Sequence, residues 1–249
     1  MLCIQQYRKE ALNMKLIADL HSHTLMSGHA FGTIREMAQA AADMNLPILG
    51  ITEHAPGIPG TVHPIYFWNL HCVPRELFGV RVLHGSEINV LEGGKLSLED
   101  RYIDRLDYAI AGIHTLCYTV KDRTANTTNI IGCMEAHRKV RFISHPDDER
   151  CPLDYDMLVK GARDNNVALE VNNSSLVPGN SRLNADKNYK VMLEYCEKYR
   201  VPVIVNTDAH DPSAVGHFES ALALLDSVGF DETLVLNTDE KKLLDFLLV

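Results

Sequence analysis

Residues 16–23 read Leu-Ile-Ala-Asp-Leu-His-Ser-His, a short apolar run that ends in two closely spaced histidines. The run predicts a strand over residues 16–20. Because alternate residues of a strand share a face, we expect Asp19, His21 and His23 to point in the same direction. Six further apolar runs follow along the chain, at residues 48–51, 81–87, 108–113, 141–144, 168–171 and 203–206.

Helical patterns alternate with these runs along most of the chain. The expected helices cover residues 33–44, 129–138, 154–164, 185–200, 216–228 and 239–247. This alternation is typical of parallel βαβ units, and about seven units favour a closed α/β barrel over an open sheet. The strand-to-helix joins at residues 52–76, 115–128 and 172–184 are long, which predicts functional loops at the carboxyl ends of the strands.

Length and composition describe an ordinary folded protein of 249 residues, 46% hydrophobic, with 24 Lys and Arg against 33 Asp and Glu. No linker or repeat divides the chain, so we expect one domain over residues 15–249 after an N-terminal extension over residues 1–14. A net charge of −9 argues against stable nucleic-acid binding, because such proteins neutralise phosphates with Lys and Arg. No apolar run reaches the ~18–20 residues that span a bilayer, so no membrane partner is expected.

The six cysteines are scattered without a Cys-x-x-Cys pair, a pattern typical of free thiols in a reducing compartment. The first 14 residues are too charged for the apolar core of a signal peptide. We therefore expect a cytoplasmic protein. Nothing in the sequence indicates an oligomeric state.

Six of the seven expected strands carry histidines or carboxylates at the same end. Any one of these histidines could be an ordinary hydrogen-bonded core residue, and the pair His21 and His23 alone is evenly balanced between that interpretation and a metal site. Convergence at one end of a barrel favours a multinuclear metal centre, because a divalent metal accepts lone pairs that would otherwise be costly to bury. Nitrogen and oxygen donors without thiolate indicate a hydrolytic site for zinc, manganese or iron.

The motifs at these strand ends are Asp-Leu-His-Ser-His at 19–23, Thr-Glu-His at 52–54, an isolated His114, Ser-His-Pro at 144–146 and Asp-Ala-His at 208–210. Together they resemble the PHP (polymerase and histidinol phosphatase) family, from about residue 15 to residue 249. The closest resemblance is to its standalone bacterial phosphatases, which implies a distorted (β/α)7 TIM-like barrel with three divalent ions, zinc first and manganese or iron as alternatives. Glu53 departs from the family motif, which often has Asp there.

The resemblance also implies a ligand set for each ion. The first ion would be held by His21, His23, Glu87 and Asp208. Glu87 would bridge to a second ion, which His114 and His145 complete. His29, His54 and His210 would hold the third.

Other residues receive weaker assignments. Asp19 is expected to orient a histidine, and Arg182 to clamp phosphate through its guanidinium fork, although an exposed loop arginine is an equal alternative. Lys121 and Arg123 are lesser phosphate candidates. We interpret Asp147, Asp148 and Glu149 as solvated loop charges, one of which could donate a proton, and the polar tract 170–175 as lying near the active face. His63 and His71, beside the aromatic residues 66–68, predict a partial lid, whereas His84, His137 and His217 are expected to be structural.

These residues lead to one functional hypothesis, the hydrolysis of small phosphomonoesters by a metal-bridging hydroxide that attacks phosphorus. Neither a Gly-x-Ser-x-Gly elbow nor a P-loop is present. The alternatives are histidinol-phosphate phosphatase within the same family, a non-catalytic metal-binding PHP module, and a hydrolase of the amidohydrolase type. Glu87, the pair His29 and His54, and the Asp208-x-His210 motif argue against the last of these.

Overall fold

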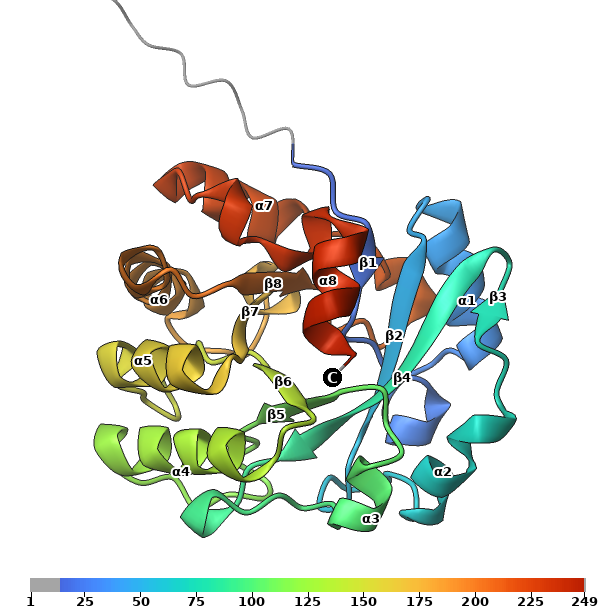
Figure 1. The fold of residues 1–249 in the computed structure, drawn as a ribbon, viewed down its shortest axis with the longest axis horizontal. Coiled ribbons are helices and arrows are strands. Elements are labelled where there is room, and N and C mark those ends of the chain that lie inside the picture. The colour runs from blue at the N-terminus through green and yellow to red at the C-terminus, as the bar shows by residue number, and fades with distance from the viewer. Residues whose placement is uncertain (1–13, 249) are drawn as a thin grey trace, which may run out of the picture.

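The computed structural model describes residues 14–248, in which one parallel sheet curls into a nearly closed barrel (Figure 1). Seven strands pair in parallel in the order β1-β2-β4-β5-β6-β7-β8, and β3 pairs with β4 in the antiparallel sense. The strands are β1 (Ala18–Asp19), β2 (Ile48–His54), β3 (Glu76–Leu77), β4 (Val80–Asn89), β5 (Ala109–Gly112), β6 (Val140–Ile143), β7 (Ala168–Asn172) and β8 (Val203–Asn206). The expected (β/α)7 TIM-like barrel is confirmed.

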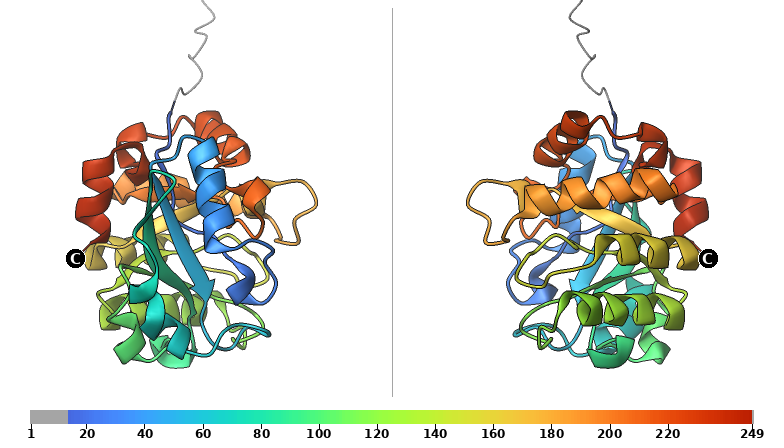
Figure 2. Two further views of the ribbon diagram at one scale, coloured as in Figure 1. Left: turned by 90° about the vertical axis from the view of Figure 1, so that its right-hand side faces the viewer. Right: turned by 90° about the vertical axis from the view of Figure 1, so that its left-hand side faces the viewer.

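Helices cover the outside of this barrel. They are α1 (Ile34–Asp43), α2 (Ile65–Trp68), α3 (Asp100–Ile103), α4 (Arg123–Ala136), α5 (Tyr155–Asn165), α6 (Ala185–Tyr199), α7 (Glu219–Val228) and α8 (Glu240–Leu247). The side views show α4, α5 and α6 side by side along one flank of the sheet (Figure 2). The main core lies between these helices and the outer faces of the strands.

The barrel interior is apolar at the amino-terminal ends of the strands. There Ile48, Leu83 and Phe142 pack together with Leu243 and Leu247 of α8. Figure 1 shows α8 in front of the ring of strands, where it covers this opening. The polar side chains are thus left to the opposite, carboxyl-terminal opening.

One tyrosine fills the middle of the interior. The Tyr108 hydroxyl donates a hydrogen bond to the Leu20 carbonyl oxygen at 2.6 Å. A Cβ atom at Gly50 would lie only 1.9 Å from that hydroxyl, so the glycine is required by close approach. The aromatic ring therefore separates the apolar half of the barrel from the polar half.

Asn237 closes the seam between the first and last strands of the barrel. This fully buried side chain donates to the carbonyl oxygens of Ala18 in β1 (2.9 Å) and Val205 in β8 (2.6 Å), and it accepts from the Val205 amide (3.1 Å). Leu20 also donates its amide proton to the Asn206 side chain at 2.9 Å. Side-chain amides thus replace the strand ladder that a fully closed barrel would have.

The structure corrects several expected boundaries. β1 ends at Asp19, so strand alternation does not extend to His21, and Ala18 and Leu20 line the interior instead. The short strand β3 was missed because two residues carry no readable pattern. Helix α4 begins at Arg123 and not at residue 129, because the Asp122 side chain caps the Ala125 amide at 2.8 Å.

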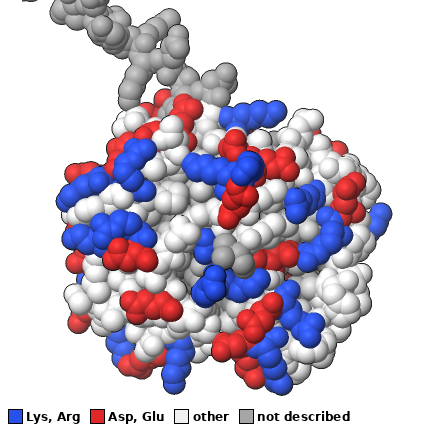
Figure 3. All heavy atoms as spheres, in the orientation of Figure 1, with Lys and Arg blue, Asp and Glu red and all other residues white. Residues whose placement is uncertain are grey.

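The ends of the chain and its surface add three facts. Residues 1–13 of the expected extension, with Cys3, lie outside the described residues, whereas Met14, expected to belong to the extension, packs in the main core. The five described cysteines are free thiols, and no helix within residues 14–248 is long and apolar enough to cross a membrane. On the face shown in Figure 3, basic and acidic side chains are interspersed.

We expect Asn237→Ala to lower the free energy of unfolding by about 2–4 kcal/mol, because three buried backbone groups lose their partner. Urea denaturation followed by circular dichroism measures this change. Asn69→Ala, at an exposed asparagine, is the matched control and should stay within about 0.5 kcal/mol of wild type. Equal stability of the two variants would show that the seam does not depend on Asn237.

Candidate metal centre

The nine predicted metal ligands all come from the carboxyl-terminal ends of strands or from the loops that follow them. His54 is the last residue of β2 and Glu87 lies near the end of β4. His114, His145 and Asp208 each follow a strand by two residues. The structure brings all nine side chains into one connected cluster through contacts between neighbouring members.

Four ligand atoms surround a common point at the centre of this cluster. The Nε2 atoms of His21 and His23 are 3.1 Å apart, and they lie 3.4 and 3.2 Å from Asp208 Oδ1. Glu87 Oε2 completes the group at 3.4 and 3.5 Å from the same two nitrogens. Five of the six edges of this group thus measure 3.1–3.5 Å, close to the edge of about 3.3 Å that a tetrahedral divalent ion with bonds of about 2.0–2.1 Å requires.

The two oxygens of Glu87 face different histidines. Oε1 lies 2.6 Å from His145 Nε2 and 3.3 Å from His114 Nε2, whereas Oε2 belongs to the group around His21 and His23. Oε2 is also 2.9 Å from His54 Nδ1. One carboxylate therefore reaches two adjacent ligand groups, as a bridging ligand must.

A third group forms at the outer edge, where the Nε2 atoms of His29 and His210 are 3.1 Å apart. Their other ring nitrogens donate to backbone carbonyls, His29 to Ser27 (3.2 Å) and His210 to Asp208 (2.8 Å). The His54 ring stacks against His29 with centroids 5.0 Å apart. Because each Nδ1 carries the proton, the two facing Nε2 lone pairs would repel each other without a cation between them.

Charge at the centre also calls for a cation. Burial disfavours a charged His21, but Glu170, Asp208 and Glu87 outweigh that effect and hold its pKa well above the usual range. Burial and the neighbouring His54 hold the pKa of His23 well below its usual range, which keeps that ring neutral. The buried atoms His54 Nδ1, Glu87 Oε2 and Asp208 Oδ1 make no hydrogen bond within the described part of the chain. These donors fit divalent metal binding.

Glu170, which was not predicted as a site residue, is the main organiser behind the ligands. Its carboxylate is fully buried, and it accepts from His21 Nδ1 (2.8 Å), Asn206 Nδ2 (2.9 Å), the His145 amide (2.8 Å) and Asn172 Nδ2 (3.1 Å). Such a partner fixes the orientation and tautomer of a metal-binding imidazole. The sequence signal that could have identified Glu170 is its position as an acidic residue in an otherwise apolar strand.

Glu53 performs a similar task for the loop after β1. It accepts from the Thr24 amide (3.1 Å) and from the Ser27 hydroxyl (2.6 Å). Ser27 in turn accepts from His23 Nδ1 at 3.0 Å. The residue that departs from the family motif thus anchors a ligand-bearing loop.

Asp19 does not orient a histidine as expected. Its carboxylate accepts from the Thr207 amide (3.1 Å) and hydroxyl (2.5 Å), and from the Gly216 amide (3.1 Å). The reason is that β1 ends at Asp19, so its side chain turns away from the face that holds His21. Asp19 therefore holds the segment that carries Asp208, and Glu170 takes the role predicted for it.

Arg182 lies beside the ligand cluster. Its Nη2 donates to Asp208 Oδ2 at 3.3 Å. Its Nη1 is buried 3.6 Å from Asp147 Oδ1 and makes no hydrogen bond to any residue that the structure describes. Asp147 was expected to be a solvated loop charge, but it is fully buried and accepts from Tyr189 (2.8 Å). Burial raises the pKa of Asp147 to about 6.

The remaining loop residues and histidines with predicted roles make contacts outside the ligand cluster. In the loop predicted to be a partial lid, Phe67 packs in the main core, Trp68 lies against Arg105 and Tyr66 donates to Glu53 Oε1 (3.4 Å). Ile58 of the same loop lines the pocket beside the cluster. Lys121 pairs with Glu92 (3.5 Å) and Arg123 with Glu149 (2.9 Å). Asp148 pairs with Arg150, His137 with Asp100, and His217 with Glu219, whereas His84 is buried.

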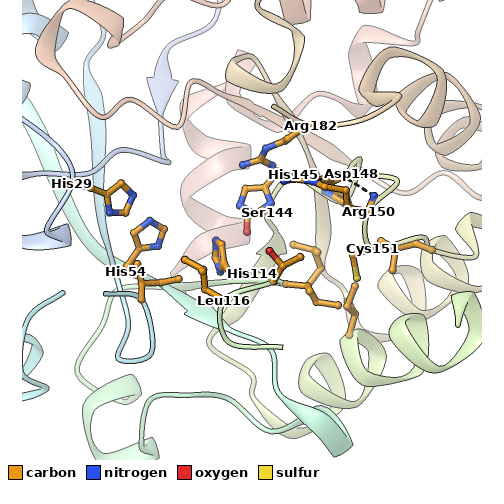
Figure 4. A pocket seen from close by; sticks show the side chains of 17 residues that line it. His29, His54, His114, Leu116, Ser144, His145, Asp148, Arg150, Cys151 and Arg182 are labelled. Atoms are coloured by element: carbon orange, nitrogen blue, oxygen red, sulfur yellow. Dashed lines mark hydrogen bonds and ion pairs between the residues drawn. The ribbon is translucent and has the colours of Figure 1, made fainter. Parts of the chain in front are cut away.

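A pocket of about 190 Å³ opens beside the cluster (Figure 4). His29 and His54 line one side, His114 and His145 the middle, and Arg182 the rim. Four of the expected ligands of the second and third ions, His29, His54, His114 and His145, thus line this pocket, where a small molecule can reach them.

We expect Glu170→Gln to weaken zinc binding by about 10- to 100-fold, because an amide nitrogen cannot accept the bonds that orient His21. Competition titration against a chromogenic chelator measures the affinity. Glu92→Gln, at an 80% exposed side chain, should bind as wild type does. Unchanged affinity together with a lower melting temperature would assign Glu170 to the fold alone.

Comparisons with known proteins agree with this geometry. The model of the PHP domain family matches residues 19–234. A probable phosphatase of Clostridium novyi is 37% identical over 235 residues, covering 94% of this chain and 95% of that protein, and one of Syntrophotalea carbinolica is also 37% identical, covering 94% and 97%.

Among solved structures, a histidinol phosphate phosphatase from Lactococcus lactis, complexed with zinc, L-histidinol and phosphate, superposes with a TM-score of 0.58. It is 15% identical and covers 86% of this chain and 94% of its own, so this similarity concerns the fold alone. The family model and the two sequence relatives carry the assignment: the chain belongs to the PHP domain family.

Proposed function

We propose that this protein is a phosphatase that hydrolyses small phosphomonoesters at a centre of three divalent metal ions, with zinc as the first candidate. The observation that carries the proposal is the Glu87 carboxylate, whose two oxygens reach two separate groups of histidines. The curated relatives named as probable phosphatases support the reaction class. The cluster of nine nitrogen and oxygen donors supports the ion count.

Each residue has a defined task in this proposal. His21, His23, Glu87 and Asp208 would hold the first ion, Glu87 with His114 and His145 the second, and His29, His54 and His210 the third. When bound, the ions would supply a bridging hydroxide nucleophile and neutralise the phosphate oxygens.

Arg182 would bind the phosphate group itself. Its Nη1 protons have no acceptor among the described residues, although the guanidinium lies on the rim of the pocket. A guanidinium donates two parallel hydrogen bonds to phosphate oxygens. Asp19 would act as a positioning residue, because it touches the segment that carries Asp208 and not the pocket.

The size of the pocket supports a small substrate. Pockets for larger ligands typically enclose roughly 300–1,000 Å³, and this one encloses about 190 Å³. The phosphate and a compact alcohol would fill it.

We expect Glu87→Gln to lower the hydrolysis of 4-nitrophenyl phosphate by at least about 100-fold, because an amide cannot bridge two ions. Stability measured in excess chelator should stay close to that of wild type, since the side chains are nearly isosteric. The assay is run with wild type and variant, each with and without added Zn²⁺ or Mn²⁺. No metal-dependent hydrolysis by wild type would reject the proposed function. Loss of stability with activity retained would make Glu87 a structural acid.

We expect elemental analysis to find three divalent ions per wild-type chain and two in His29→Ala. His29 lies in an exposed loop and contacts the outer group only, so the variant should fold and keep the pair of ions at Glu87. His217→Ala, which removes an exposed histidine paired with Glu219, is the matched control and should retain three ions. Full metal content and full activity in His29→Ala would contradict the three-ion proposal.

A further inference from the structure

The pocket beside the ligand cluster continues past the histidines into an apolar recess. Figure 4 shows Asp148 and Arg150 on the far side of the pocket from His29 and His54, with His114 between them. The pocket wall also includes six apolar side chains, those of Ile58, Leu116, Ile130, Ile143, Cys151 and Leu153, together with the polar Thr115 and Ser144. Of these six, all except Leu116 are buried.

The charged groups of the recess already have partners. Arg150 donates two hydrogen bonds from Nε to Asp148, at 3.0 and 2.8 Å, and its Nη2 lies 2.5 Å from the same carboxylate. Arg182 faces Asp208 and Asp147 at the rim. Among residues 14–248, the lining therefore offers no unpaired carboxylate for an ammonium group, and no unpaired cation beyond the rim for a second anion.

Cys151 adds to the apolar character of the wall. Its side chain is buried, and burial raises the pKa of the thiol to about 11. A protonated thiol packs as a small apolar group. The recess thus presents a mainly apolar surface that ends at the paired side chains of Asp148 and Arg150.

We propose that this recess binds the leaving group of the substrate, and that it selects phosphomonoesters of uncharged, largely apolar alcohols. The inference rests on the proposed function, since it places the phosphate at the histidine cluster and the rest of the ester in the recess. Hydrolysis consumes one water, breaks the bond between phosphorus and the ester oxygen, and releases the neutral alcohol and inorganic phosphate. An alcohol with an ammonium or carboxylate would bury that charge without a partner, which disfavours its binding.

Three substrates with closely related leaving groups test the inference: benzyl phosphate, 4-(aminomethyl)benzyl phosphate and 4-carboxybenzyl phosphate. With zinc-supplemented wild type we expect kcat/KM for benzyl phosphate to exceed that for each charged derivative by at least about tenfold. The charged group is remote from the ester oxygen, so the reactivity of the phosphate changes little among the three.

Leu116 allows the wall to be changed without disturbing the core, because its side chain is 72% exposed at the mouth of the recess. We expect Leu116→Asp to raise the ratio of kcat/KM for the aminomethyl substrate to that for benzyl phosphate by at least about fivefold, through a new ion pair. Leu116→Asn has the same shape without the charge and should leave this ratio near the wild-type value. Leu248→Asp adds the same charge at an exposed leucine outside the pocket and serves as the second control.

The outcomes separate the inference from the proposed function. If none of the three substrates nor 4-nitrophenyl phosphate is hydrolysed with added metal, the proposed function fails. If the substrates are hydrolysed but a charged derivative equals or exceeds benzyl phosphate, the phosphatase stands and the apolar leaving-group site is overturned. An equal change of ratio in Leu116→Asp and Leu248→Asp would also overturn it, because the effect would then come from net charge and not from the recess.

Discussion

The constraint on which this structure depends is the repulsion among lone pairs brought together at one end of the barrel. The Nε2 atoms of His21 and His23 approach to 3.1 Å, and two carboxylates lie within 3.5 Å of them. Without positive charge between them, these atoms would be both desolvated and mutually repelled. A divalent ion between these atoms would bond to them, so the folding of this region and its affinity for metal are coupled. The hydrogen bonds that hold each ring, such as that from His21 to Glu170, prevent the ligands from turning away from that point.

The rest of the barrel lets this polar end exist. Apolar packing is concentrated at the amino-terminal opening under α8, and Tyr108 occupies the middle of the interior above the Gly50 backbone. The main core outside the strands then carries the stability that a charged interior cannot supply. The seam between β1 and β8 shows the same separation. Asn237 joins the two strands in the apolar half. Asp19 binds the segment that leads to Asp208 in the polar half. Apolar packing therefore stabilises the amino-terminal half of the barrel interior, and hydrogen bonds and opposite charges stabilise the carboxyl-terminal half.

The sequence predicted those features that repeat along the chain. Seven apolar runs and the polar residues at their ends indicated the barrel and the nine clustered side chains, because strand ends of a parallel sheet meet at one edge. What it could not provide were contacts made by single residues across long sequence separations. Glu170 bonds to His21 from 149 residues away, and Asn237 bonds to Ala18 from 219 residues away. Glu170 stands out locally as an acid in an apolar strand, but no local pattern identifies the partner of either residue. Asp19 was misassigned for a related reason, since the point at which β1 ends depends on pairing with β2 and not on its own residues.

The architecture also separates the ligands from the residues that shape the pocket. Six of the nine candidate ligands lie near a strand end or two residues beyond it, as His114 follows β5, whereas the wall residues Leu116 and Cys151 lie farther along the loops after β5 and β6. A ligand is held by neighbouring strands and by the bonds behind it, so its position changes little when a loop residue is exchanged. A wall residue such as Leu116, which is exposed and lies outside the core, can vary in shape and polarity with little effect on the candidate ligands. Under the proposed function, selectivity for the leaving group would therefore change by substitution at such loop positions, while the candidate ligands at the strand ends stay in place.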